Sequence, residues 1–104
     1  MNDETARFFR HLIVDCEYIA PFPINETYYV TVQQLLFTHA VIVGRIGDWW
    51  GYSFRWCYPT KTEAQIAIAE WMAKDWSDEP KGYIRRVGAV PAPGELRPDL
   101  AEVS

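Results

Sequence analysis

The stretch Gly47-Asp48-Trp49-Trp50-Gly51-Tyr52-Ser53-Phe54-Arg55-Trp56-Cys57-Tyr58-Pro59 decides the fold of this chain. Residues 38–46 before its first glycine are rich in β-branched side chains, and residues 52–58 alternate aromatic side chains with Ser53, Arg55 and Cys57. Both patterns are typical of β-strands. Because only a short loop bounded by Gly47 and Gly51 separates them, we expect an antiparallel hairpin over residues 38–58.

The pairing register of this hairpin follows from where the aromatic rings can be buried. Directly opposed residues of an antiparallel pair share a face, so a slip of one residue exchanges the faces. We predict that Ile42 opposes Trp56, because this register collects the apolar side chains on one face. The alternative parity sets Ile42 against Arg55 and separates the rings from Ile42. In the predicted register the outer, half-polar face carries His39, Val41, Val43, Arg45, Ser53, Arg55 and Cys57.

A helix is expected on each side of the hairpin in the sequence. Residues 3–19 repeat apolar side chains at spacings of three and four, which is typical of an amphipathic helix, and Pro21 and Pro23 end it. Thr60-x-x-Glu63 has the spacing of a capping box, so a second helix should begin there and run to about residue 76. We expect its apolar stripe to cover the aromatic face of the hairpin, with Ala64, Ala67, Ile68, Trp71, Met72 and Trp76 as its members.

The remaining segments complete a small α+β domain. Tyr28 to Val32 reads as extended, residues 33–37 have neither a strand period nor a helix period, and residues 83–87 are a last short strand. We therefore predict one domain over residues 1–88, with an N-terminal helix and one helix packed on an antiparallel sheet of three to four strands. Residues 89–104 contain three prolines and read as a C-terminal tail.

Composition bounds the class of protein. The chain has 104 residues, of which 49% are hydrophobic, and this is the profile of a single packed domain. A net charge of −4 argues against broad binding to a phosphate backbone, which requires a basic face. The two cysteines have no Cys-x-x-Cys spacing, and no apolar run reaches the roughly 18 residues of a membrane span. We expect a cytoplasmic protein with reduced cysteines and no membrane contact.

Groups that could carry chemistry lack the neighbours that catalysis needs. His11 lies at the border of the first helix, where it needs no catalytic explanation. His39 and Cys57 share the outer face in the predicted register and could form a thiolate–imidazole pair, but no third group is evident to orient it. Two such residues are also too few for structural zinc, and no phosphate-binding glycine loop is present. We therefore predict no enzyme, no catalytic residue, no metal and no cofactor.

Trp49 and Trp50 are the most informative pair for binding. A tight loop can bury one indole beside a helix, but it cannot easily bury two from adjacent positions. An exposed tryptophan near arginine is typical of binding hot spots, whereas a tryptophan that folds back over the core would be structural. Both readings remain open at this stage. The candidate binding residues are Arg45, Asp48, Trp49, Trp50 and Arg55.

A resemblance adds a setting to these expectations. Residues 37–87 contain Gly44-Arg45-Ile46-Gly47, Arg55-Trp56-Cys57-Tyr58 and Glu79-Pro80-Lys81-Gly82-Tyr83. This series resembles a set of small hypothetical proteins of bacteriophages, prophages and plasmids. The resemblance implies a mobile-element setting and no activity, so no site residues carry over from it.

By analogy with other small acidic proteins of this kind, we expect an accessory that binds a host protein or protein complex, such as an anti-CRISPR inhibitor. The alternative is nucleic-acid binding through an arginine and aromatic sheet surface. A homodimer also remains open, because an unpaired edge strand and the acidic first helix each offer a contact.

Overall fold

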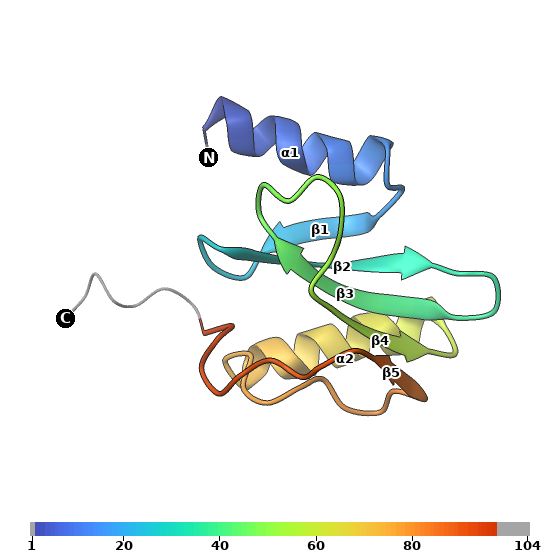
Figure 1. Ribbon diagram of the computed structural model, residues 1–104. Coiled ribbons are helices and arrows are strands. Elements are labelled where there is room, and N and C mark those ends of the chain that lie inside the picture. Colours follow the sequence, from blue (N-terminus) through green and yellow to red (C-terminus); the bar gives the residue numbers. More distant parts are fainter. Residues whose placement is uncertain (1, 98–104) are drawn as a thin grey trace.

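Five strands and two helices make up residues 2–97, the part of the chain that the computed structural model describes (Figure 1). In chain order they are α1 (Asp3–Val14), β1 (Ile19–Pro23), β2 (Tyr28–Gln34), β3 (His39–Arg45), β4 (Phe54–Tyr58), α2 (Lys61–Ala73) and β5 (Arg85–Val87). The strands lie in sequence order in one sheet, each antiparallel to its neighbours. The predicted α+β class is confirmed, but the sheet has five strands instead of three to four.

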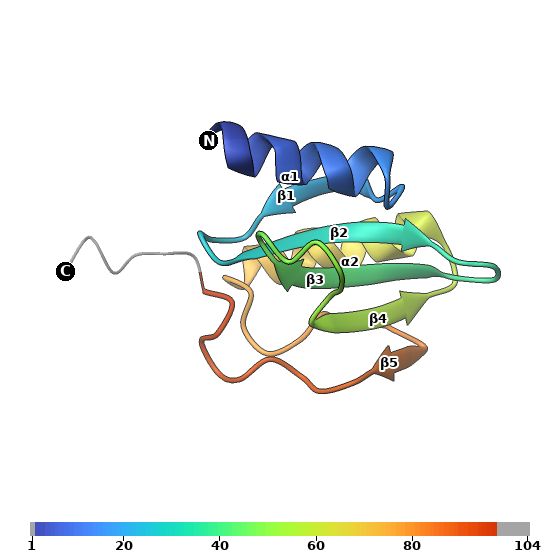
Figure 2. The ribbon, with the colours of Figure 1, turned by 45° about the horizontal axis from the view of Figure 1, so that its top comes forward.

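The two helices pack against opposite faces of the sheet (Figure 2). α2 covers β2, β3 and β4, and its buried side chains belong to the larger core. α1 lies over the β1 side of the other face, where Phe8, Phe9 and Leu12 pack on Tyr29 of β2. Phe8 and Leu12 are four residues apart, so both lie on the face of α1 that packs on Tyr29. This contact explains the amphipathic pattern predicted for the segment.

The predicted register of the β3–β4 hairpin is wrong by one residue. Ile42 opposes Arg55, and Val41 opposes Trp56. The rings of Phe54, Trp56 and Tyr58 do turn toward α2, as expected, but they lie beside Val41 and Val43. The physical reason is that Ala40 and Ile42 are also fully buried, on the opposite face, where Tyr18 and Leu35 pack on them. A strand that is buried on both faces has no polar side from which its parity can be read.

β1 was not expected, because prolines interrupt it. Pro21 and Pro23 lie on an edge strand, where a missing N–H removes no bond from the centre of the sheet. The pairing of β1 with β2 is irregular between Ile19 and Phe22, and Ala20 between them has φ +48°. α1 also ends earlier than expected, at Val14 in place of residue 19, where Asp15 and Cys16 both donate to the His11 carbonyl and Glu17 has φ +57°.

Tryptophan side chains hold α2 on the sheet. Trp71 is 2% exposed, and its ring centre lies 5.2 Å from those of Trp56 and Trp76, edge to face in both cases. The indole of Trp71 donates to the Ser77 carbonyl (3.0 Å), and that of Trp56 donates to the Glu79 carboxylate (2.8 Å). Each buried N–H therefore has a partner, which avoids the cost of burying an unpaired donor. At the start of α2 the Thr60 hydroxyl accepts from the Glu63 N–H, so the predicted cap is confirmed.

The segment predicted to be a tail from residue 89 is packed on the domain as far as Arg97. Leu96 is 1% exposed and belongs to the core between the sheet and α2. Asn25 donates from its side chain to the Arg97 carbonyl (2.9 Å), and the Tyr28 hydroxyl donates to the Glu95 carboxylate. Residues 98–104 lie outside the described residues. Within residues 2–97, neither helix has the length and apolar content that crossing a bilayer requires.

Candidate binding surface

The loop between β3 and β4, residues 46–53, has a fixed conformation built from its own hydrogen bonds. The Asp48 N–H donates to the Arg45 carbonyl (3.0 Å) across a tight turn whose third residue is Gly47, with φ +95°. Glycine adopts that conformation without strain. The Asp48 side chain then accepts from the Trp50 N–H (3.1 Å). Asp48, one of the predicted binding residues, therefore shapes the loop.

The two adjacent tryptophans of this loop have opposite environments. Trp49 is 40% exposed and lies on α1, with its ring centre 5.3 Å from that of Phe8 and 4.7 Å from that of His11. Trp50 is 95% exposed. The Trp49 indole packs the loop on α1, and the Trp50 indole is exposed to solvent. The two readings left open by the sequence thus apply to different residues.

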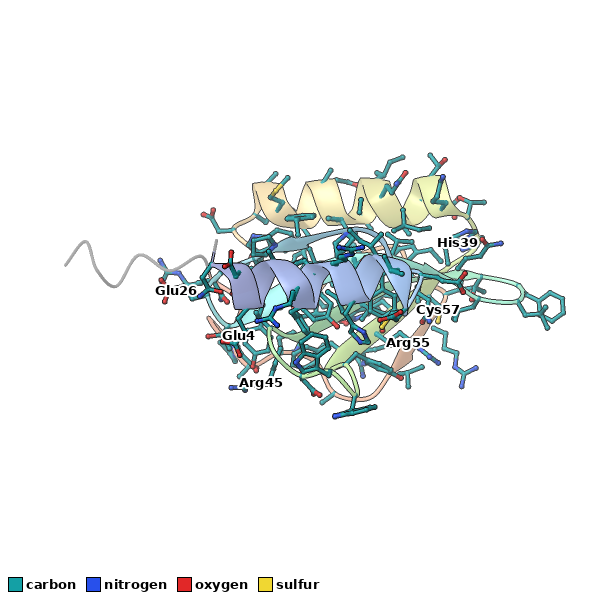
Figure 3. All side chains as sticks on the ribbon, turned by 90° about the horizontal axis from the view of Figure 1, so that it is seen from above. Glu4, Glu26, His39, Arg45, Arg55 and Cys57 are labelled. Atoms are coloured by element: carbon teal, nitrogen blue, oxygen red, sulfur yellow. The ribbon has the colours of Figure 1, made fainter. Side chains whose placement is uncertain are left out.

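The predicted arginines do not form one cluster. Arg45 pairs with Tyr28 across the sheet, and its guanidinium carbon lies 5.6 Å from the centre of that ring. Arg55 lies on the opposite face, 5.6 Å from the centre of the Tyr52 ring, and well away from Arg45 in Figure 3. Expecting both guanidiniums on one outer face depended on the register that the structure corrects.

Arg55 shares its face with Arg85 instead. Arg85 opposes Cys57 across β4 and β5, and Cys57 is two residues from Arg55 on the same strand. Arg86 points to the other face, where it forms an ion pair with Glu79 (3.4 Å). The Arg55 Nε atom is buried and has no hydrogen-bond acceptor within residues 2–97. We call Trp50, Tyr52, Arg55 and Arg85 the Trp50–Arg85 surface.

A histidine-centred arrangement at the end of α1 was not recognised in the sequence. His11 Nδ1 lies 2.8 Å from an Asp15 carboxylate oxygen, and His11 Nε2 lies 3.5 Å from the Cys16 sulfur. This is the outline of a nucleophile, a base and an orienting acid. In the sequence, this arrangement could have been recognised from Asp15 and Cys16, which follow His11 by four and five residues at the end of the helix.

The electrostatics around Cys16 oppose its use as a nucleophile. Burial, followed by the neighbouring Asp15 charge, raises the pKa of the Cys16 thiol. The thiol also follows the C-terminus of α1, where the helix dipole disfavours an anion. Activated cysteines lie in electropositive surroundings that lower the thiol pKa, which is the reverse of this case. The arrangement is therefore suited to packing the end of α1 under Trp49.

The other suggested pair, His39 and Cys57, is not formed. His39 opposes Tyr58 and Cys57 opposes Ala40, so their side chains leave the sheet on opposite faces. Residues 2–97 also contain no group of three or more histidine, cysteine, aspartate or glutamate side chains arranged to hold a metal ion.

A second exposed apolar site was missed because its residues had no clear period. Leu36 and Phe37 form the two-residue turn between β2 and β3, closed by a hydrogen bond from the Leu35 N–H to the Thr38 carbonyl (2.8 Å). Each is 86% exposed. Polar residues and glycine are usual at such a turn. Two large apolar residues between the strands were therefore the sequence feature that could have indicated this exposed site.

No family model, curated protein or solved structure matches this chain. Its chemical capacity therefore has to be judged from the surfaces themselves. The Trp50–Arg85 surface offers an indole, a phenol and two guanidiniums, which can bind apolar groups and anions. It offers no activated nucleophile.

Proposed function

We propose that this chain is a non-enzymatic protein that binds another protein through the Trp50–Arg85 surface. The observation that carries the proposal is that Trp50 is almost fully exposed on a loop whose backbone is held by hydrogen bonds and by Trp49. A loop whose backbone is already held loses little conformational freedom when a partner covers its exposed indole, so more of the burial contributes to affinity. Tryptophan, tyrosine and arginine are the side chains enriched at such contacts.

The five predicted binding residues take different parts in this proposal. Trp50 and Arg55 contact the partner directly. Asp48 and Trp49 hold the loop that presents Trp50. Arg45 packs on Tyr28 on the other face and lies outside the contact.

The partner that we propose is a host protein or protein complex, with the chain acting in the cytoplasm as an accessory or inhibitor encoded by a mobile element. The resemblance of residues 37–87 to small phage, prophage and plasmid proteins supports this setting by analogy. An anti-CRISPR inhibitor is one example of such an accessory. The electrostatics around Cys16 support a role without covalent catalysis.

Nucleic-acid binding is the second candidate, because Arg55 and Arg85 share one face. Two observations weigh against it. Phe54, Trp56 and Tyr58 lie beneath α2 and cannot stack bases, and the chain as a whole is acidic.

Affinity capture from a host lysate tests the proposal. The wild-type protein, the Trp50→Ala variant and the Ile13→Ala variant serve as baits, the last because Ile13 is an exposed apolar residue of α1. A protein retained by the wild type and Ile13→Ala but lost by Trp50→Ala would support the proposed contact. Nuclease treatment and a salt series separate the alternative, since binding through phosphates weakens steeply with salt. A partner retained equally by all three baits would reject the role of Trp50.

A further inference from the structure

One half of the sheet is covered on one side by side chains in place of a helix. α1 lies over the β1 side, and within residues 2–97 no helix crosses β3, β4 and β5 on that face (Figures 1 and 2). Ala40, Ile42 and Cys57 of this face are nevertheless buried, and Tyr18 and Leu35 pack against them. Arg55 extends from the same face, opposite Ile42. Arg55 is therefore a charged side chain on a face whose neighbouring positions are apolar and buried.

Two arginines of this face are neighbours. Arg55 opposes Val87 and Arg85 opposes Cys57, so the two arginines are diagonal neighbours on one face, with Cα atoms roughly 7 to 8 Å apart. Within residues 2–97 neither of them forms an ion pair, whereas Arg86 on the reverse face is paired with Glu79. Two adjacent positive charges repel each other until an anion lies between them.

Among residues 2–97, Arg55 has no ion-pair partner. Its buried Nε–H has no partner within the described chain, and the Tyr52 ring contacts the guanidinium. The Tyr18 ring lies near that of Tyr29, with 6.5 Å between the ring centres, and the Arg55 charge acts on the Tyr18 hydroxyl. A buried donor without a partner costs free energy, so the described chain does not satisfy the hydrogen-bonding capacity of the Arg55 guanidinium.

We propose that Arg55 and Arg85 form a carboxylate-binding site that receives acidic side chains of the partner protein. This inference rests on the protein-binding function proposed above and names the chemistry that the partner presents. Planar guanidiniums match carboxylates through paired hydrogen bonds, and the Tyr52 ring beside Arg55 provides apolar contact for the rest of an acidic segment. Two guanidiniums on a chain of net charge −4 are too few for a nucleic-acid backbone, which needs many phosphate contacts.

The side-chain Nε–H signals of arginine in a ¹⁵N NMR spectrum test the site directly. The probes are the blocked peptide acetyl-Glu-Ala-Glu-amide, its neutral match acetyl-Gln-Ala-Gln-amide, inorganic phosphate and a thymidine oligonucleotide, all at one ionic strength. The glutamate peptide should shift the Arg55 and Arg85 signals saturably. The glutamine peptide should not shift them, and the Arg45 signal should stay in place. Arg55→Lys and Arg85→Lys should each weaken binding roughly tenfold, because lysine keeps the charge but loses the paired geometry, whereas Arg45→Lys should have no effect.

The outcomes distinguish this inference from the function on which it rests. Absence of saturable shifts with the glutamate peptide, or stronger binding of phosphate or the oligonucleotide, would overturn the carboxylate site. The capture experiment with Trp50→Ala would still decide the protein-binding function. Saturable peptide binding together with a partner that is retained equally by Trp50→Ala would keep the carboxylate site and reject the role of Trp50 in the proposed function.

Discussion

Single contacts decide how closely β2 and β3 can approach. Tyr29 and Gly44 oppose each other, and the buried Tyr29 ring lies over the position that a side chain at residue 44 would need. A Cβ atom built on Gly44 would lie 2.5 Å from the Tyr29 hydroxyl oxygen. The ring cannot turn away easily, because Phe8 and Phe9 pack edge-on against it. The glycine is therefore required by packing and not by its backbone angle.

We expect Gly44→Ala to lower the free energy of unfolding by about 1 to 3 kcal/mol, the usual cost of overfilling a packed core. Urea denaturation followed by circular dichroism measures it. Gly51→Ala is the matched control, since a Cβ there would meet no atom closer than 3.9 Å. Equal stability of the two variants would show that Tyr29 moves freely and that the contact has no energetic weight.

At the scale of the residue, the sequence predicted the tryptophan loop better than the arginine pair. The spacing of two adjacent indoles makes burial of both awkward, and Trp50 is the exposed one, although the sequence left open whether each indole is exposed or packed on the core. The partner of Arg55 follows from the strand register, which is set by both faces of the sheet together. Arg85 therefore could not be chosen over Arg45 before the register was known.

At the scale of the element, features with a local sequence signal were predicted, whereas the edge strand β1 was not. The cap at Thr60 and most of the apolar stripe of α2 are properties of a few consecutive residues, so they could be predicted, whereas Met72, which was expected in the stripe, is 48% exposed. β1 is stabilised by its pairing with β2 despite Pro21 and Pro23, and no local pattern reports that pairing. The turn at Leu36 and Phe37 is likewise fixed by the strands on either side of it.

The attachment of α2 gives a prediction at this scale. We expect Trp71→Ala to cost about 3 to 5 kcal/mol, because it empties the contact between Trp56 and Trp76 and removes a buried hydrogen bond to Ser77. Chemical denaturation measures the loss. Met72→Ala, at a half-exposed neighbouring position, should change stability far less. If both variants lost the same amount, Trp71 would not be the side chain that holds α2.

Over the whole molecule, the chain ends were the least predictable part. Residues 89–97 look like a tail because two prolines and a glycine surround few apolar side chains. They are held instead by contacts with residues far away in the sequence, namely Leu96 in the core and Asn25 bonded to the Arg97 carbonyl. The sequence lacks any short-range signal for such contacts. Fold class and the position of the core, which depend on many residues at once, were predictable from the pattern.

Alkaline pH should destabilise the whole molecule through two buried tyrosines. Burial raises the pKa of the Tyr29 hydroxyl, and burial together with the nearby Glu79 charge raises the pKa of Tyr58. The folded state then holds these protons at a pH where the unfolded chain has begun to release them. Their contribution is therefore fully present below about pH 10, the ordinary tyrosine pKa, and is lost as the pH rises toward the raised folded-state pKa values.

Above about pH 10, each of these tyrosines should lower the free energy of unfolding by at most about 1.4 kcal/mol per pH unit. Urea denaturation at a series of pH values measures how steeply the free energy of unfolding falls with pH. Tyr29→Phe and Tyr58→Phe should each make this fall less steep by the contribution of the tyrosine that is replaced. Trp50→Ala, which alters no titrating group, should keep the slope of the wild type. A wild-type slope retained by both phenylalanine variants would mean that the alkaline loss of stability arises elsewhere, because a side chain without a hydroxyl cannot release the proton that produces it.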